Sequence, residues 1–168
     1  PVPFDFRAGV VLDREGIRLD KGTLAYGKST VDFSASIDQF ENPRISIPFT
    51  GHLQVSDFHK AFGLPIESTG NLHAEGEFRY HDKIWELTGD ARGSGLAVRS
   101  GAVRIDNIGL RTKLALEKDS FVFTNLSASA LGGEVRGQAS FRDGRRLTVK
   151  AQANNLALDQ VSRAGGVG

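Results

Sequence analysis

Apolar and polar residues alternate with a period of two along most of the chain. In the clearest segment, 70–80, every second residue is glycine, alanine or a larger apolar residue, and the residues between them are polar. A period of two places successive side chains on opposite sides of an extended backbone, so it predicts a β-strand with one apolar and one hydrated face. The same alternation recurs in other segments: 31–37, 45–55, 85–92, 108–116, 121–130, 134–142 and 147–153.

The connections between these segments are short and polar. Asp143-Gly144 is a two-residue hairpin signal, because both central positions of a type I′ turn require a positive φ. Parallel neighbours need crossovers of a dozen or more residues, so short links predict antiparallel pairing. We therefore expect an antiparallel meander of about ten strands. The other short connections are Asp13-Arg14-Glu15-Gly16, His81-Asp82-Lys83 and Glu117-Lys118-Asp119.

Two short helical turns are predicted to interrupt the strands. Ser56 is a candidate cap for a helix over 57–62, which Gly63 and Pro65 would end, and Asp159 is a candidate cap for a second helical turn. Segments 53–64 and 156–167 align at a constant offset of 103 residues, from Leu53 to Leu156. This alignment indicates a weak internal repeat, the alternative being two unrelated helical turns.

A sheet of this size cannot leave its one apolar face in water. A sandwich, a closed barrel and an open trough are the possible solutions. The apolar positions are rich in glycine and alanine, which fill a core poorly but permit strong curvature. We therefore predict an all-β fold, a long antiparallel meander curled into an open β-taco or β-groove with one or two short helical turns. The alternative is an ordinary sandwich packed by the 11 phenylalanines with leucine, isoleucine and valine.

An elongated apolar trough suits a lipid chain. Each acyl methylene removed from water contributes about 0.8 kcal/mol, so a sixteen-carbon chain gains on the order of 10 kcal/mol. Such a trough lowers the barrier to lipid transfer without any reactive group. The residues predicted to line it are Leu72, Ala74, Phe78, Leu87, Leu110, Leu114, Leu116, Val135, Ala139, Phe141, Leu147 and Val149.

Composition removes several classes of function. Lys+Arg 21 against Asp+Glu 20 gives a net charge of +1, which argues against nucleic acid as a partner. The absence of cysteine excludes a disulfide framework and a thiolate zinc site. No stretch approaches the roughly 18 apolar residues of a spanning helix. With no methionine, the sequence is interpreted as a fragment, residues 1–168, of a longer repetitive β-groove protein.

We find no predicted catalytic or metal site. The four histidines form no metal-binding motif, and His52 and His73 fall on polar strand faces. Glu75 and Glu77 share a strand face with His73 and Arg79; paired carboxylates can perform acid–base chemistry, but alternating charges are typical of a solvated face. We therefore expect a protein that is not an enzyme and uses no cofactor or metal.

Two motifs resemble those of TamB/AsmA-like proteins. The segment 70–78 resembles their G-x-L-x-A-x-G-x-F strand, and 125–137 resembles a recurrent hairpin of the form nl-x-a-x-l-G-G-x-v-x-G. Segments 53–62 and 156–164 are similar to the strand and helical turn that follow in those repeats. The resemblance extends from about Gly16 to Ala164.

This resemblance implies a periplasmic protein of a diderm bacterium, anchored in the inner membrane by its parent chain. It implies a repeating β-groove that carries phospholipid acyl chains toward the outer membrane, and, through TamB, outer-membrane protein assembly with an Omp85-type barrel. Two alternatives stay open. One is a scaffold that assembles outer-membrane proteins by adding strands at its sheet edges, and the other is a secreted all-β carbohydrate-active domain.

Overall fold

A computed structural model describes residues 4–12, 14, 16–38, 41–57, 67–117, 120–142 and 146–165, apart from the side chains of Phe141 and Leu147. The described chain is almost entirely β-strand, with short helical segments after β4 and after β10. The elements are β1 (Asp5–Leu12), β2 (Gly16–Tyr26), β3 (Ser29–Asp38), β4 (Arg44–Gln54), β5 (Glu67–His81), β6 (Ile84–Ser100), β7 (Val103–Glu117), β8 (Ser120–Ala130), β9 (Gly133–Arg142), β10 (Arg146–Asn154) and α2 (Leu158–Ala164).

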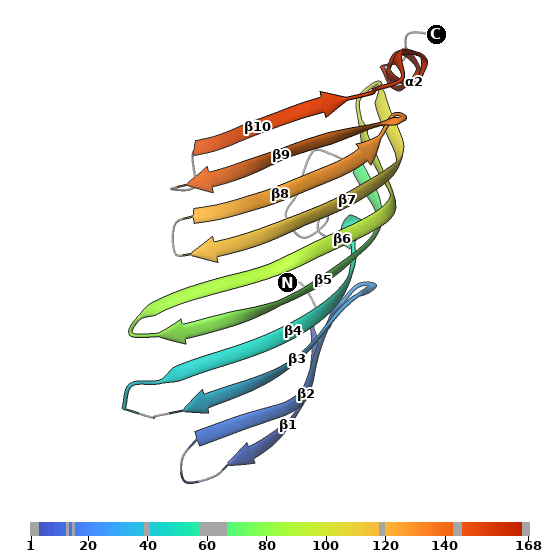
Figure 1. Ribbon diagram of the computed structural model, residues 1–168. Helices are drawn as coiled ribbons and strands as arrows, with labels where there is room; N and C mark the ends of the chain where they lie inside the picture. The colour runs from blue at the N-terminus through green and yellow to red at the C-terminus, as the bar shows by residue number, and fades with distance from the viewer. Residues whose placement is uncertain are drawn as a thin grey trace.

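The strands form one ten-stranded sheet in which spatial order follows sequence order from β1 to β10 (Figure 1). Every neighbouring pair is antiparallel, which confirms the predicted meander. The β5–β6 hairpin has the predicted short polar turn, in which Asp82 and Lys83 both adopt positive φ, 50° and 64°. Paired positive φ values match the twist of the flanking strands. The predicted Asp143-Gly144 turn lies outside the described residues.

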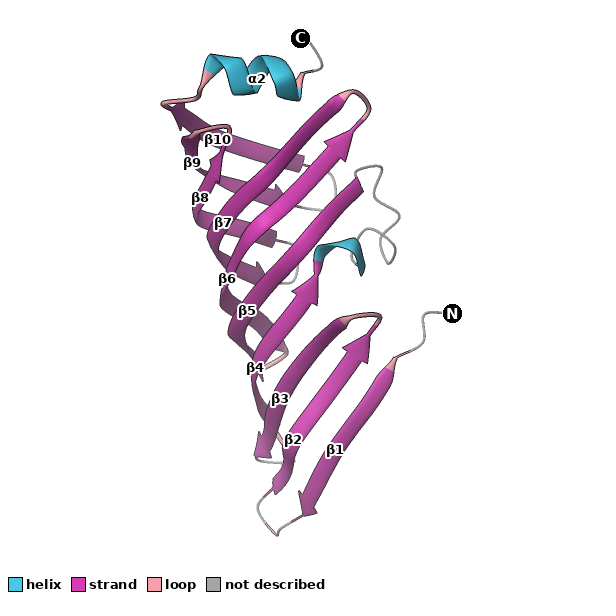
Figure 2. Ribbon diagram, turned by 90° about the vertical axis from the view of Figure 1, so that its right-hand side faces the viewer, coloured by secondary structure: helices cyan, strands magenta, loops and turns pink. Residues whose placement is uncertain are grey.

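The sheet is open and forms a single layer. Its strands bend along their length, and its first and last strands lie at opposite ends without meeting (Figure 2). The accessible surface area is 11876 Å², whereas a compact domain of this mass exposes about 8,100 Å². Within the described chain, no large side chain is fully buried. The open curled sheet is therefore present, and the sandwich and the barrel are not.

Glycines mark places where neighbouring backbones approach closely. A Cβ at Gly76 would lie 2.2 Å from the carbonyl oxygen of Thr88, and a Cβ at Gly137 would lie 2.3 Å from that of Lys150. Real Cβ atoms do not tolerate such distances, so a larger residue at either position would force the strands to shift. Strongly curved sheets use glycine in this way, which is the role predicted for the small residues.

The helical segments differ from the predicted caps. Helical backbone begins at Val55, so Ser56 lies inside the first turn and is not its cap. The helix α2 begins at Leu158 after Ala157, which makes no side-chain capping hydrogen bond. Asp159 was predicted to cap this helix, but it lies in the first turn and pairs with Arg163. Residues 58–66 and 166–168, with the rest of the first predicted helix and both segment ends, lie outside the described residues.

Both helical segments cover a glycine turn of an earlier hairpin. After β4, the carboxylate of Asp57 accepts hydrogen bonds from the Lys28 backbone N–H (2.9 Å) and the Ser29 hydroxyl (2.8 Å), over the turn at Gly27. After β10, the Ala157 N–H donates to the Leu131 carbonyl (2.9 Å), over the turn at Gly132. The helical starts, Val55 and Leu158, keep the spacing of the predicted repeat.

Candidate functional site: the apolar face

The strand register brings the residues predicted to line a groove onto one side of the sheet, here called the apolar face. Each residue pairs across strands with another member or with a glycine, alanine or aromatic residue of the same face. Phe141 and Leu147 are placed by backbone pairing alone. One cross-strand row is Leu72, Gly93, Leu110, Ala128 and Val135; another is Phe78, Leu87, Leu116, Phe121, Phe141 and Leu147; a third is Gly89, Leu114, Phe123, Ala139 and Val149.

A lane of small residues crosses the middle of this face, and we call it the furrow. Ala74 and Thr112 within it are each 7% exposed, because taller side chains on either flank shield them. From β4 to β10, with neighbouring strands about 4.8 Å apart, the furrow is about 29 Å long. It runs across the strands, along the long axis of the sheet. The furrow consists of Gly51, Ala74, Ala91, Thr112, Gly137 and Ala151; on β8 the row is interrupted by a larger residue, Leu126, which pairs with Gly137.

Large rings fill part of the space that glycines leave on the apolar face. A Cβ at Gly22 would lie 2.5 Å from the ring of Phe33, and a Cβ at Gly76 would lie 2.9 Å from the ring of Phe49. The Phe33 ring also reaches that of Phe6, with centroids 6.0 Å apart. At these two glycines the space beside the backbone is therefore filled, because cross-strand aromatic rings lie over them.

Thr112 is a member of the furrow that hydrophobic patterning missed. Its hydroxyl donates to the carbonyls of Thr124 and Lys113, each at 3.2 Å. The β7–β8 register shifts beside it, and Asn125 in β8 has a positive φ of 51°. A bulge leaves a carbonyl without its ladder partner, and a buried hydroxyl can satisfy it. The sequence did contain a signal for this position: Thr112 is two residues from both Leu110 and Leu114, so a period of two places it on the same face.

The apolar face is most exposed at the two edge strands. Phe6 (61%) and Leu12 (72%) in β1 and Val149 (59%) in β10 are largely accessible. Each of these strands has a neighbour on one side only. Both edges therefore present apolar side chains together with backbone groups that are not paired within the sheet.

The opposite side, here called the polar face, carries charge networks between strands. Arg79 lies 2.5 Å from Glu77, which also accepts a 2.7 Å hydrogen bond from Ser46. Arg79 and then Ser46 lower the pKa of Glu77 below its ordinary value. Glu134 has the same surroundings, with Arg136 at 2.9 Å and Ser127 at 2.7 Å. These carboxylates are held ionised, which fits the solvated face predicted for them.

The described residues contain no group of histidine, aspartate and glutamate side chains arranged to hold a metal ion. His52 and His73 lie side by side on the polar face, with ring centroids 5.0 Å apart. Among the described helices, none has the length and apolar character needed to cross a lipid bilayer.

Comparison with known proteins returned no match: no family model, no curated protein and no solved structure resembles this chain closely enough to assign it.

Proposed function

We propose that this chain is a non-enzymatic segment of a periplasm-spanning bridge, whose apolar face shelters lipid acyl chains during transport to the outer membrane. The observation that carries the proposal is an apolar face continuous across ten strands and left without a second layer in the described chain. The motif resemblance to TamB/AsmA-like proteins supports the compartment, the inner-membrane anchor and the link to an Omp85-type partner.

The unfavourable free energy of exposed apolar surface favours binding of an apolar ligand. The molecule exposes 11876 Å², which exceeds the area of a compact domain of this mass by about 3,800 Å². Uncovered apolar surface is unfavourable by about 25 cal/mol per Å², so even a fraction of that excess drives binding of an apolar partner. An acyl chain lying in the furrow would be removed from water along the long axis of the sheet.

A second candidate function is assembly of client proteins by strand addition. The observation that favours it is β1, an edge strand with apolar side chains exposed beside unpaired backbone groups. Such an edge can template pairing with another extended chain.

Site-specific photocrosslinking separates these functions. A photoreactive residue at Leu114, on the apolar face, and one at Lys113, its neighbour on the polar face, are placed in the full-length protein in cells. Because adjacent strand residues point to opposite faces, the two positions differ in little else. We expect lipid adducts at Leu114 at least five times as often as at Lys113.

A probe at Val10 in β1 tests the second candidate. Adducts there with nascent barrel proteins, together with equal lipid labelling at Leu114 and Lys113, would replace lipid sheltering with strand addition. Lipid labelling concentrated at Leu114 would support the first function whatever β1 contacts.

A further inference from the structure

A continuous row of histidine and arginine side chains crosses the polar face, and we call it the basic row: His52, His73, Arg92 and Arg111. These residues occupy directly paired positions on four adjacent strands, His52 opposite His73, His73 opposite Arg92, and Arg92 opposite Arg111. Like charges directly opposite each other in a sheet repel and destabilise the pairing. Arg92 and Arg111, the two permanent cations of the row, are such a pair, and an anion between them would offset the repulsion.

Protein carboxylates do not supply that compensation. Within the described chain, neither Arg92 nor Arg111 forms an ion pair, whereas Arg79 and Arg136 on the same face each pair with a glutamate. Glu75 and Asp90, in the adjacent row, line a second hollow together with Arg92 and Arg111, but their ion pairs are with other side chains: Glu75 is 3.9 Å from His73, and Asp90 is 4.0 Å from Lys113.

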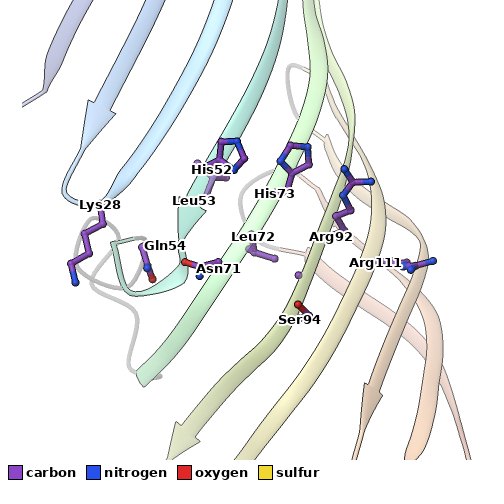
Figure 3. A pocket seen from close by; sticks show the side chains of 11 residues that line it. Lys28, His52, Leu53, Gln54, Asn71, Leu72, His73, Arg92, Ser94 and Arg111 are labelled. Atoms are coloured by element: carbon purple, nitrogen blue, oxygen red, sulfur yellow. The ribbon is translucent and has the colours of Figure 1, made fainter.

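The basic row lines a hollow of about 540 Å³. Figure 3 shows the side chains in the order His52, His73, Arg92 and Arg111 across neighbouring strands, with Arg111 at one end of the hollow and Lys28 at the other. Neutral hydrogen-bonding side chains, together with Leu53, Leu72 and Gly93, complete the wall, and no carboxylate lies among the described lining residues. The polar residues that line it are Lys28, His52, Gln54, Asn71, His73, Arg92, Ser94 and Arg111.

We propose that Arg92 and Arg111 clamp a phosphate group in this hollow, with Asn71 and Ser94 as neutral hydrogen-bond partners. Paired guanidinium groups match the oxygen geometry of phosphate and bind it through parallel charge-assisted hydrogen bonds. The phosphate offsets the repulsion between the two arginines. The site lies on the face opposite the furrow, so it does not depend on the proposed acyl-chain function.

Two sources can supply the phosphate, the free ion and a lipid headgroup. Binding of inorganic phosphate is measured by titration calorimetry on the purified full-length protein, with sodium chloride at equal ionic strength as the reference. Flotation compares binding to vesicles of phosphatidylcholine, whose headgroup phosphate is offset by the choline cation, with binding to vesicles that also contain phosphatidylglycerol, whose headgroup phosphate keeps a net negative charge. A response to either phosphate probe supports the site and identifies the source; no response beyond chloride, together with no preference for phosphatidylglycerol, overturns it.

The substitutions Arg111→Gln and Arg92→Gln should each weaken phosphate-dependent binding at least tenfold. Arg136→Gln is the matched control, because Arg136 continues the same row through Ser127 but is already paired with Glu134. It should change binding less than twofold. Equal losses in all three variants would indicate diffuse electrostatic attraction and overturn the clamp.

A stability measurement separates the clamp from a structural role. Without phosphate, Arg111→Gln should unfold at the same or a higher urea concentration than the wild type, because it removes a like charge. Phosphate should raise the unfolding midpoint of the wild type and not that of the variant. A variant that unfolds earlier without phosphate and still gains from its addition would contradict the proposal.

Discussion

The two faces of this single-layered sheet differ in how far their side chains are satisfied within the sheet itself. On the polar face, charged side chains find partners on adjacent strands, as Glu77 does with Arg79 and Ser46, and water satisfies the remainder. On the apolar face, cross-strand packing buries only a few of the described side chains, among them Ala74 and Thr112 of the furrow and Ala35 and Leu96 outside it. Polar groups are satisfied locally, whereas apolar area can be hidden only by another surface. The apolar face is therefore where a ligand or partner gains most.

The largest expected difference in stability is between two glycine-to-alanine variants, one on each face of the sheet. Gly76→Ala on the apolar face would push a Cβ against the Thr88 carbonyl, so we expect a loss of about 3 kcal/mol in the free energy of unfolding. Gly109→Ala on the polar face would meet only the Ser129 hydroxyl, which can rotate away, so we expect a loss below about 1 kcal/mol. Urea unfolding followed by Trp85 fluorescence measures both, and equal losses would contradict the close backbone approach.

The same polar substitution on neighbouring residues tests the faces directly. Leu114→Gln places an amide among apolar side chains and should reduce the free energy of unfolding by about 2 kcal/mol. Lys113→Gln removes only a weak 4.0 Å ion pair with Asp90 and should change it by less than about 0.5 kcal/mol. Circular dichroism during urea unfolding provides the comparison. Similar values for the two variants would show that the apolar face contributes no more than the polar face.

The buried hydroxyl of Thr112 allows the same threonine-to-valine substitution to be compared in the furrow and on the polar face. Thr112→Val removes the donor to the Thr124 carbonyl, and we expect a loss of about 1 kcal/mol because the carbonyl is left unsatisfied. Thr50→Val on the polar face serves as the control and should be neutral or slightly stabilising, because valine favours strands. Lipid labelling at Leu114 should survive Thr112→Val, since the furrow then becomes wholly apolar; loss of labelling would give the hydroxyl a role in binding.

The smallest effect is expected from pH on the polar face. Arg79 and Ser46 lower the pKa of Glu77 in the folded state, so ionised Glu77 stabilises the fold above its unfolded pKa of about 4.3. This stabilisation is lost as the pH falls through the lowered folded pKa. The difference in unfolding midpoint between wild type and Glu77→Gln should therefore be largest at neutral pH and vanish in acid. A difference that grows in acid would reverse the assigned sign.

The approximate number of strands, their antiparallel order and the side of the sheet on which each side chain lies could be predicted from the sequence. A period of two and short polar links depend on neighbouring residues alone. The helix caps could not be predicted in this way. Ser56 and Asp159 have capping side chains, but each helix begins two residues earlier than such a cap predicts, where the segment covers a glycine turn of a distant hairpin. That contact involves residues far apart in the chain, so no local pattern encodes it.

The candidate sites divide in the same way. The alternation along each strand correctly predicts that Leu72, Leu114 and Val149 lie on one face of the sheet. It also predicts that His73 and Arg92 lie on the other. It did not reveal the furrow, the position of Thr112 or the basic row. Each of these depends on which residues of separate strands stand opposite each other, and bulges such as the one at Asn125 shift that pairing.

The sequence by itself determined that the chain forms an antiparallel meander with one apolar face, because alternation fixes the direction of each side chain along its own strand. Only the tertiary structure decided that the sheet stays open, that small residues on six of the seven strands from β4 to β10 align into a lane, and that two arginines without an ion-pair partner in the described chain occupy paired positions on β6 and β7. The physical reason is that cross-strand register and curvature arise from turns, bulges and close backbone contacts, which act between strands.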